Sequence, residues 1–320
     1  MINRKNIFVT GSNGFIGQSL CHILKQKYNI FKGVQKKVLS QQPYQTIIQD
    51  LTSVTDWDES FKNIDTIIHL AARVHILRED SSDPLQAFRA VNTYGTQNLA
   101  YAAAKQGVRR FIFVSSIGVN GSKTEGLPFS ESDTPNPYNA YCRSKLEAEA
   151  LLKEVARETG LEVVILRPPL VYGPGVKGNF LTLLNIVAKG LPLPFAAINN
   201  RRSYLSVYNL IDCIDHVIDH PRAQGEIFCI CDKEEISTSS LIEKLAEYMS
   251  KKVWQPAMPS SVLYYFSRIF GMNERMGKLC TSLQIDASKA REVLQWSPPF
   301  SMDQGLKKTV SWYMENKGEK

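Results

Sequence analysis

The first twenty residues constrain the fold more than any other stretch of the chain. The segment "IFVTGSNGFIGQSL" places Gly11, Gly14 and Gly17 between an expected strand and an expected helix. Glycines at such a junction allow a tight turn, a close backbone approach to a pyrophosphate and close packing of the helix on the strand. The helix N-terminus also offers unpaired N–H groups to an anion. This start therefore predicts a parallel sheet whose first turn binds a dinucleotide.

The glycine spacing and the second expected strand leave the choice of dinucleotide open. The pattern is Gly-x-x-Gly-x-x-Gly, and a glycine triplet also occurs in ordinary strand-to-helix turns. No acid stands where an NAD-specific site usually carries one for the ribose 2′-hydroxyl. Gln35 occupies that region, followed by Lys36 and Lys37. The lysines suit the 2′-phosphate of NADP or are solvated surface charges, and the sequence does not decide between them.

The first half of the chain alternates β-branched runs with helical stretches. This pattern is typical of a parallel sheet covered on both faces, so we expect an α/β, Rossmann-like, doubly wound fold. The expected strands are residues 6–9, 30–34, 44–49, 66–70, 111–115 and 162–166, and the expected helices are residues 15–27, 86–106 and 141–158.

The composition changes after Arg167. The stretches "RPPLVYGPGVKGNF" and "KGLPLPFAAINNRR" are rich in proline and glycine, which indicates a domain boundary. We expect a dinucleotide-binding domain over residues 1–170, to which 203–232 return. Residues 171–202 and 233–320 then form a smaller α/β substrate-binding domain. Within the second half we expect strands at 203–207 and 226–231, helices at 239–250 and 302–315, and an amphipathic helix in "SVLYYFSRIFGM" rather than a membrane-surface segment.

Composition excludes several classes of protein. The 320-residue chain has no apolar run of the roughly 18 residues that span a bilayer and no signal-peptide core, so we expect no stable membrane insertion and a cytoplasmic location. The net charge of +7 comes from dispersed basic residues, which favours a phosphate-bearing small molecule over a nucleic acid. No metal site is expected, because the six cysteines form no Cys-x-x-Cys pair and there is no His cluster. These cysteines are Cys21, Cys142, Cys213, Cys229, Cys231 and Cys280.

The segment "AYCRSKLEAEALL" carries the second chemical motif. A tyrosine has a pKa near ~10 and is a poor base unless a nearby cation lowers that pKa, typically by about 1–3. Lys145 lies one helical turn after Tyr141 and can supply that cation. Ser115 and Ser116 follow a buried strand at its carboxyl end, where doubly wound sheets bind their ligands. A solvated Tyr and Lys on an amphipathic helix is the plainer alternative, and the position of the serines argues against it.

Several motifs together resemble the extended short-chain dehydrogenase/reductases that act on nucleotide sugars. They are "VTGSNGFIG", "QDL", "HLAA", "VNTYGTQNL", "FVSSIGVNG", "AYCRSK", "LRPPLVYGPG", "NNRRSYLSV" and "DASKAREVLQW", and they span essentially the whole chain. The resemblance implies that Tyr141 is the general acid/base, that Lys145 activates it and binds a ribose, and that Ser116 lies beside the reacting sugar oxygen. It also implies NAD, with NADP as the alternative.

The resemblance assigns further residues to the cofactor and to the substrate. Asp50 and Leu51 are expected at the adenine, and Arg202 at the substrate diphosphate. For Arg275, a second diphosphate contact and a surface role weigh equally. The expected cofactor residues are Gly11, Asn13, Gly14, Phe15, Ile16, Gly17, Gln35, Lys36, Asp50, Leu51, Leu70, Ala71, Ala72, Asn92, Ser115, Tyr141, Lys145 and Pro168. The expected substrate residues are Ser116, Asn179, Phe180, Arg202, Arg275 and Ser282.

Three positions depart from the family pattern. Asn120 stands where the family has a tyrosine, Leu170 where it has an asparagine, and Cys142 where it has a glycine. The first two are expected near the substrate and so bear on its identity. A bulky family tyrosine that disfavours N-acetyl groups corresponds to Ser282 or Leu283, both smaller, which favours an N-acetylhexosamine.

The expected reaction is C4 epimerisation of a UDP-hexose through a 4-keto intermediate, with UDP-GlcNAc/UDP-GalNAc as the substrate pair in surface-polysaccharide synthesis. Four alternatives remain. They are a 4-keto-reductase of a UDP-N-acetyl-6-deoxyhexosamine, a polyprenyl-diphosphate substrate, a non-catalytic NAD(P)-binding regulator and, less favoured, a dehydratase. A dehydratase needs an acidic pair after the serine, where Ile117 and Gly118 stand. The resemblance also implies a homodimer through residues 86–106 and 141–158.

Overall fold

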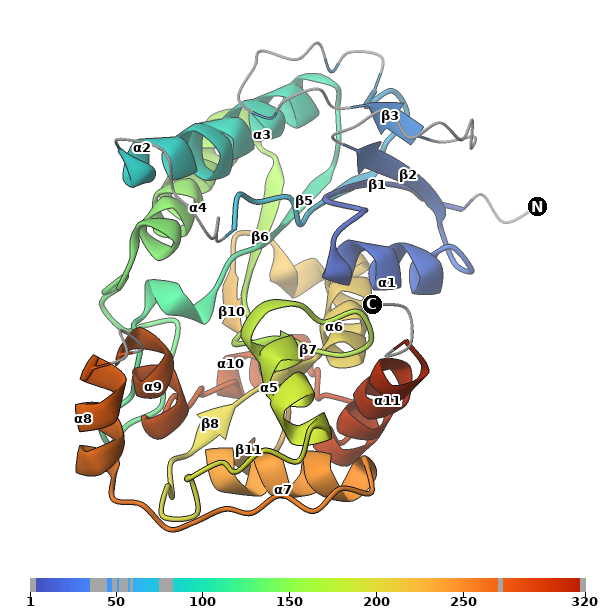
Figure 1. The fold of residues 1–320 in the computed structure, drawn as a ribbon. Helices are drawn as coiled ribbons and strands as arrows, with labels where there is room; N and C mark the ends of the chain where they lie inside the picture. Colours follow the sequence, from blue (N-terminus) through green and yellow to red (C-terminus); the bar gives the residue numbers. More distant parts are fainter. Residues whose placement is uncertain are drawn as a thin grey trace.

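The computed structural model contains a seven-stranded parallel sheet in the order β10-β6-β5-β4-β1-β2-β3 (Figure 1). The structure describes residues 4–34, 45–47, 51, 57, 60–74, 83–269 and 273–316. The order is that of a doubly wound sheet with one strand added at its edge, which confirms the expected fold class. The strands are β1 (Asn6–Thr10), β2 (Asn29–Val34), β3 (Gln45–Ile47), β4 (Thr66–His69), β5 (Arg110–Val114), β6 (Glu162–Arg167) and β10 (Ile227–Cys229).

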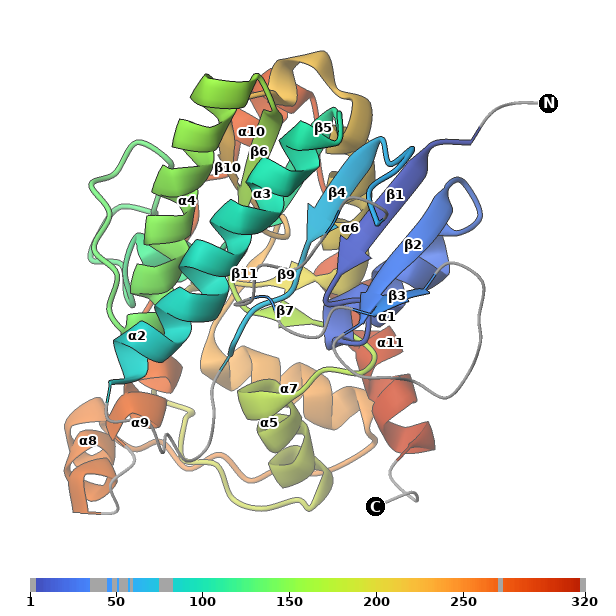
Figure 2. The same cartoon turned by 90° about the horizontal axis from the view of Figure 1, so that it is seen from above.

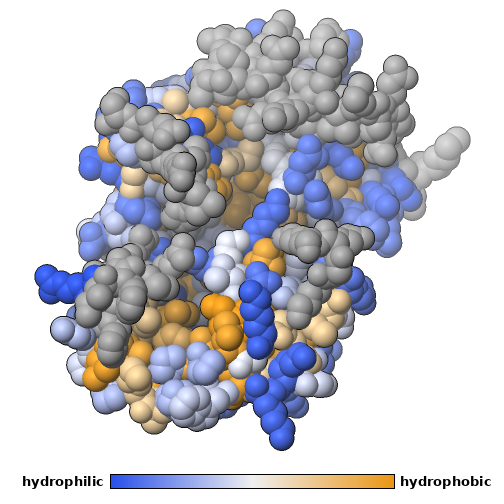
Figure 3. Space-filling model, in the orientation of Figure 1, coloured by the Kyte–Doolittle hydropathy of each residue, from blue (hydrophilic) through white to orange (hydrophobic). Residues whose placement is uncertain are grey.

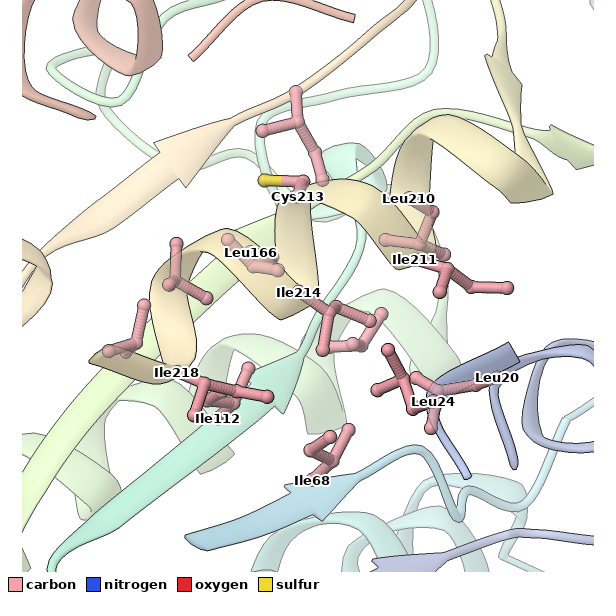
Figure 4. Close-up of a cluster of buried hydrophobic side chains, with 14 of the residues drawn as sticks. Leu20, Leu24, Ile68, Ile112, Leu166, Leu210, Ile211, Cys213, Ile214 and Ile218 are labelled. Carbon is pink, nitrogen blue, oxygen red and sulfur yellow. The ribbon is translucent and has the colours of Figure 1, made fainter. Parts of the chain in front are cut away.

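Helices cover both faces of the sheet because successive strand residues point to opposite sides. Ile112 and Val114 of β5 pack toward α1 (Phe15–Leu24) and α6 (Val207–Asp219), while Phe111 and Phe113 pack toward α3 (Gly95–Lys105) and α4 (Ala140–Thr159). Figure 2 shows α3 and α4 side by side over one face. Figure 4 shows the opposite core, in which leucines and isoleucines of α1 and α6 meet the strands.

Local sequence explains where α4, the helix of Tyr141, starts and stops. The Asn139 side chain accepts a hydrogen bond from the Cys142 backbone N–H at 2.8 Å and caps the N-terminus. At the other end Gly160 adopts the left-handed conformation (φ 78°) that terminates helices at little cost. The cap therefore fixes Tyr141 in the first turn of this helix.

Two expected elements differ from the structure. Residues 203–207 do not form one strand: β8 (Arg202–Ser203) and β9 (Leu205–Ser206) are two short strands, and the Ser206 hydroxyl then caps α6 from Val207 onward. The expected helix 86–106 begins earlier, as α2 (Pro84–Phe88), and passes through the π-helical η1 (Arg89–Tyr94) before α3. Sequence periodicity does not reveal this π-helical turn, because a segment of 6 residues is too short to establish a period of its own.

The second half of the chain packs around its own core below the sheet in Figure 1. The strand β11 (Glu235–Ile236) pairs antiparallel with β8, and β7 (Val171–Tyr172) pairs with β9. Figure 3 shows hydrophobic side chains gathered on the lower part of this face, interrupted by hydrophilic ones. The helices here are α5 (Gly178–Ala188), α7 (Thr238–Tyr248), α8 (Ser260–Ile269), α9 (Asn273–Cys280), α10 (Ser288–Leu294) and α11 (Met302–Glu315).

Two negative findings apply to the described part of the chain. None of its helices has both the length and the apolar character needed to cross a bilayer. Its His, Cys, Asp and Glu side chains form no group of three that could hold a metal ion.

Candidate active site

The glycine turn after β1 is shaped by contacts that exclude any side chain. A Cβ on Gly17 would lie 2.2 Å from the Gly11 carbonyl oxygen, and one on Gly11 would lie 2.7 Å from the Ala71 nitrogen. Gly11 also has φ +68°, a conformation that favours glycine. No side chain caps the N-terminus of α1 at Gly14, so its N–H groups face the turn without a side-chain acceptor. This cradle fits a dinucleotide pyrophosphate.

A chain of neutral hydrogen bonds joins this turn to η1. The Thr10 hydroxyl accepts from the Ala71 N–H (3.2 Å) and bonds His69 Nδ1 (2.6 Å), while His69 Nε2 bonds the Thr96 hydroxyl (2.9 Å). Thr96 in turn donates to the Asn92 carbonyl at 2.7 Å. Burial lowers the pKa of His69 to about 3, so the ring is neutral and carries its proton on Nε2.

Asn92 is one of the expected cofactor residues, and its side chain is 1% exposed. Its amide exchanges two hydrogen bonds with the Arg73 backbone and donates to the Ser144 hydroxyl on α4 at 3.0 Å. The π-helical turn places the Asn92 side chain between the backbone that follows β4 and the helix α4. Such turns are frequent at functional sites, and nothing in the sequence analysis pointed to this one.

The three expected catalytic residues come from the end of β5 and the start of α4. Ser116 caps the short 3-10 helix η2 (Ile117–Val119), and its hydroxyl accepts from the Gly118 N–H at 3.1 Å. Lys145 is 2% exposed and its ammonium donates to the Val114 carbonyl at 2.9 Å. Tyr141 is half-buried and packs edge-on against Phe88. The lysine therefore ties α4 to the strand that leads into Ser116.

The protein environment moves the pKa values of both Tyr141 and Lys145 away from their usual values. Burial raises the pKa of Tyr141 above its usual value, and burial lowers the pKa of Lys145 to about 7, with the Glu149 carboxylate opposing that decrease. The sequence analysis expected the Lys145 cation to lower the pKa of Tyr141; in the structure burial dominates the pKa of this tyrosine, and Lys145 donates to the Val114 carbonyl. A positive charge placed beside Tyr141 would lower the pKa of its hydroxyl.

A buried ion pair lies directly behind these residues. Arg167 (3% exposed) binds Glu149 (2% exposed) through Nε to Oε1 at 3.1 Å and through Nη2 to Oε2 at 2.5 Å. The Ser115 hydroxyl donates to Glu149 at 2.5 Å, and Arg167 donates to the Asn120 side chain at 3.0 Å. Asn120 was expected near the substrate, but it is 3% exposed and its amide also donates to the Ser130 carbonyl. Sequence analysis missed Glu149 and Arg167, although Glu149 follows Lys145 by one turn.

The remaining expected cofactor residues come from several elements of the first half of the chain. Leu51 is buried beneath α3, since a Cβ on Gly95 would meet the Leu51 carbonyl at 2.6 Å. The Pro168 carbonyl accepts from the Ile117 N–H at 2.9 Å. Gln35, Lys36, Lys37 and Asp50 lie outside the described residues. Asn13 is exposed, and the side chains of Phe15, Ile16, Leu70, Ala71 and Ala72 are partly exposed.

Apart from Ser116, the expected substrate residues lie in the second half of the chain. The Arg202 guanidinium is partly exposed and donates to the Thr281 carbonyl at 2.8 Å. Ser282 accepts from the Arg201 N–H through its hydroxyl and from the Thr124 N–H through its carbonyl. Asn179 is exposed in the first turn of α5, whereas Phe180 is buried on Tyr172, which leaves its backbone for a ligand. Arg275 belongs to α9, and its side chain lies outside the description.

A cavity of about 630 Å³ lies beside this substrate side and contains none of the expected catalytic residues. Its wall includes Arg201, Lys233 and Glu235, and Arg201 pairs with Glu235 at 2.9 Å. The expected catalytic residues Ser116, Tyr141 and Lys145 lie instead at the carboxyl end of β5, and open parallel sheets bind their ligands at the carboxyl ends of their strands.

Known proteins resemble the chain over nearly its whole length. A UDP-glucose 4-epimerase of Vibrio cholerae is 40% identical over 315 residues, 97% of this chain and 96% of the relative. An N-acetyl-alpha-D-glucosaminyl-diphospho-ditrans,octacis-undecaprenol 4-epimerase of Escherichia coli O157:H7 is 28% identical, covering 96% of this chain and 95% of the relative. The crystal structure of a Bacillus cereus UDP-glucuronic acid 4-epimerase with NAD has a TM-score of 0.79 at 23% identity, covering 97% of this chain and 99% of the other.

The model of one protein family, described as the NAD dependent epimerase/dehydratase family, matches residues 7–231. This match and the relatives confirm the resemblance read from the motifs, and with it NAD as the cofactor and an enzyme as the kind of protein. The chain belongs to the NAD dependent epimerase/dehydratase family.

Proposed function

We propose that this enzyme interconverts the C4 epimers of a UDP-N-acetylhexosamine, with Ser116, Tyr141 and Lys145 at the reacting carbon. The observation that carries the proposal is the convergence of these side chains at the carboxyl end of β5, opposite a glycine turn built for a dinucleotide. The Vibrio cholerae UDP-glucose 4-epimerase, 40% identical along the chain, supports the position of the reaction on the sugar.

Each side chain has a distinct task in this proposal. Tyr141 exchanges a proton with the C4 oxygen, and the Ser116 hydroxyl binds the same oxygen and orients it. The Lys145 ammonium uses one of its three N–H donors on the Val114 carbonyl, which leaves two that can bind a ribose. Its positive charge also favours the ionised form of Tyr141. When bound, NAD supplies the reversible hydride chemistry and a positive charge next to the tyrosine. That charge would lower the pKa of Tyr141, which burial raises.

The cofactor would lie on the glycine turn. Gly11, Gly14 and Gly17 hold its pyrophosphate at the start of α1, and Asn92 with Pro168 line the path toward the sugar. In this proposal residues 1–170 with the returning β10 form the cofactor domain, and the second half forms the substrate domain.

The substrate would lie between those two parts of the chain. Arg202 binds the diphosphate, because planar guanidinium donors suit adjacent phosphates. Asn179 and the Phe180 backbone hold the nucleotide. Of the two positions considered for sugar selection, Leu283 is buried with Ile285, while Ser282 is partly exposed. A serine there leaves room for an N-acetyl group.

A lipid-linked sugar is a second candidate substrate. The Escherichia coli relative acts, by its name, on an undecaprenyl-diphospho sugar, and it aligns over 96% of this chain. The net charge of +7 suits a diphosphate carried on an anionic membrane surface.

We also propose a homodimer through α3 and α4. Tyr94, at the end of η1, and Tyr101, on α3, are 48% and 36% exposed on this helical layer and would supply aromatic contacts to a partner. Sedimentation equilibrium tests this, with a monomeric mass as the contrary result.

The deciding experiment has two steps. Purified protein is denatured and the released nucleotide is identified by mass, and native protein is then incubated with UDP-GlcNAc without added cofactor. Stoichiometric NAD⁺ and formation of UDP-GalNAc would establish the proposed reaction. An empty protein that consumes NAD(P)H only with a 4-keto sugar would replace it with a reductase, and turnover only of the lipid-linked sugar would select the second candidate.

A further inference from the structure

The turn that carries Ser116 and the helix that carries Tyr141 touch through a glycine and a cysteine. An ideal Cβ on Gly118 would lie 2.4 Å from Cys142 Sγ, 3.1 Å from Tyr138 Cε1 and 3.3 Å from Ser116 Oγ. Carbon atoms do not approach other heavy atoms to 2.4 Å, so the sulfur occupies the volume that a side chain at position 118 would need. The two residues are complementary in size.

Each member of this pair is bonded to a group next to the proposed chemistry. The Gly118 N–H donates to the Ser116 hydroxyl at 3.1 Å, so a shift of Gly118 moves that hydroxyl. The Cys142 N–H donates to the Asn139 cap at 2.8 Å, and Cys142 directly follows Tyr141. Contact between Gly118 and Cys142 therefore sets the spacing of the two catalytic elements.

Size rather than charge or backbone conformation accounts for the pair. Cys142 is 1% exposed, and burial raises the pKa of its thiol to about 11, so it remains a neutral filler. Gly118 lies inside the 3-10 helix η2, and its backbone does not have the positive φ that would require glycine. Its backbone would accept alanine; the Cys142 sulfur is the main obstacle to a Cβ there, while Tyr138 and Ser116 are tight neighbours that must give slightly.

We propose that Gly118 and Cys142 are positioning residues that fix the distance between the Ser116 hydroxyl and Tyr141. The inference rests on the proposed function, in which those two hydroxyls meet one substrate oxygen. The tight packing of protein interiors makes such a contact a spacer, since an added methyl must displace one of its neighbours.

A double-mutant cycle tests the pair. The variants are G118A, C142A and G118A/C142A, with G277A as a matched control because a Cβ there meets no atom within 4 Å. Steady-state kcat and KM are measured with the UDP-hexose that the wild type turns over, together with Tm and NAD binding. We expect G118A to lower kcat roughly 100-fold, as misplacement by about 1 Å does, with KM and Tm changed little.

Rescue is the decisive result. Adding C142A to G118A removes the sulfur and should restore kcat to within roughly threefold of C142A alone, because the next neighbours of the new methyl, at 3.1 and 3.3 Å, need to give by only a few tenths of an ångström. An unchanged kcat in G118A, or a double variant no better than G118A, overturns the inference. If G118A does not fold, C142A decides: kcat lowered with normal Tm supports the pair, and kcat equal to wild type overturns it.

The cycle also separates this inference from the proposed function. Wild-type protein that is inert toward every UDP-hexose removes both. An active wild type without rescue in the double variant removes only the positioning role of Gly118 and Cys142.

Discussion

The two sides of the active site hold their polar groups in opposite ways. On the sheet side, Lys145, Glu149 and Arg167 are 2–3% exposed, and each side chain has a buried partner. On the substrate side, Arg202 is partly exposed and donates to the Thr281 backbone carbonyl, and Asn179 is exposed. If the proposed roles hold, the reacting groups lie in the interior, where packing fixes their geometry, and the substrate contacts are more exposed side chains whose exchange should disturb the fold less.

The largest effect should follow loss of the Tyr141 hydroxyl. We expect Tyr141→Phe to reduce kcat roughly 10³-fold, the scale of general acid–base catalysis, with NAD binding unchanged. Tyr28→Phe is the matched control, because the Tyr28 hydroxyl bonds Asp215, and neither residue belongs to the proposed site or to the proposed dimer face. Steady-state kinetics and calorimetric titration with NAD measure both. Comparable kcat values in the two variants would remove the catalytic assignment.

The next effect concerns stability on the sheet side. Arg167→Met leaves the Glu149 carboxylate buried without its cation and should lower the free energy of unfolding by about 3–5 kcal/mol. Arg109→Met removes an exposed pair with Glu162 and should cost less than about 1 kcal/mol. Urea denaturation compares the two, and equal losses would show that the buried pair is no more important than a surface one. Restored stability in Glu149→Met/Arg167→Met would confirm that the unpaired charge is the cause.

On the same side, the buried neutral His69 should make the free energy of unfolding fall in acid. The pKa of His69 is about 3 in the folded protein and near ~6.5 in the unfolded chain, so between these values only the unfolded chain binds the proton. Its contribution to stability is complete above pH ~6.5 and falls by up to about 1.4 kcal/mol per pH unit below that. Denaturant unfolding between pH 7 and 4 should show a smaller slope for His69→Gln. The exposed His22→Gln should keep the wild-type slope, and identical slopes in all three proteins would contradict the assignment.

The smallest effect should come from the substrate side. Arg202→Ala is expected to raise KM for the UDP-sugar roughly tenfold, the value of one charge-assisted hydrogen bond, while kcat stays within about threefold. Arg201→Ala is the neighbouring control, since Arg201 is 71% exposed and pairs with Glu235. A Tm decrease in Arg202→Ala without any change in KM would make Arg202 a structural residue.

Sequence reasoning succeeded where a local pattern has one structural solution. The glycine turn, the strand-and-helix alternation and the family were read from the residues, and the structure and comparisons confirm the last two. It failed where the deciding partner is distant in sequence. Arg167 reaches Asn120 across 47 residues, and Cys142 fills the space beside Gly118 across 24. No periodicity encodes such contacts, which also explains why Asn120 was expected at the substrate.

The place of β10 at the edge of the sheet has a consequence for synthesis of the protein. This strand pairs with β6 through Phe228 and Cys229, although some sixty residues, including the helices α5 and α6, separate the two strands in the sequence. While the ribosome is still making those residues, the β6 edge carries unpaired backbone groups and the site of Phe228 stays unfilled. A nascent chain halted before Cys229 would have an incomplete sheet with an aggregation-prone edge, so folding should depend on chaperones during that interval. For the same reason, two halves of the chain expressed separately should fold poorly.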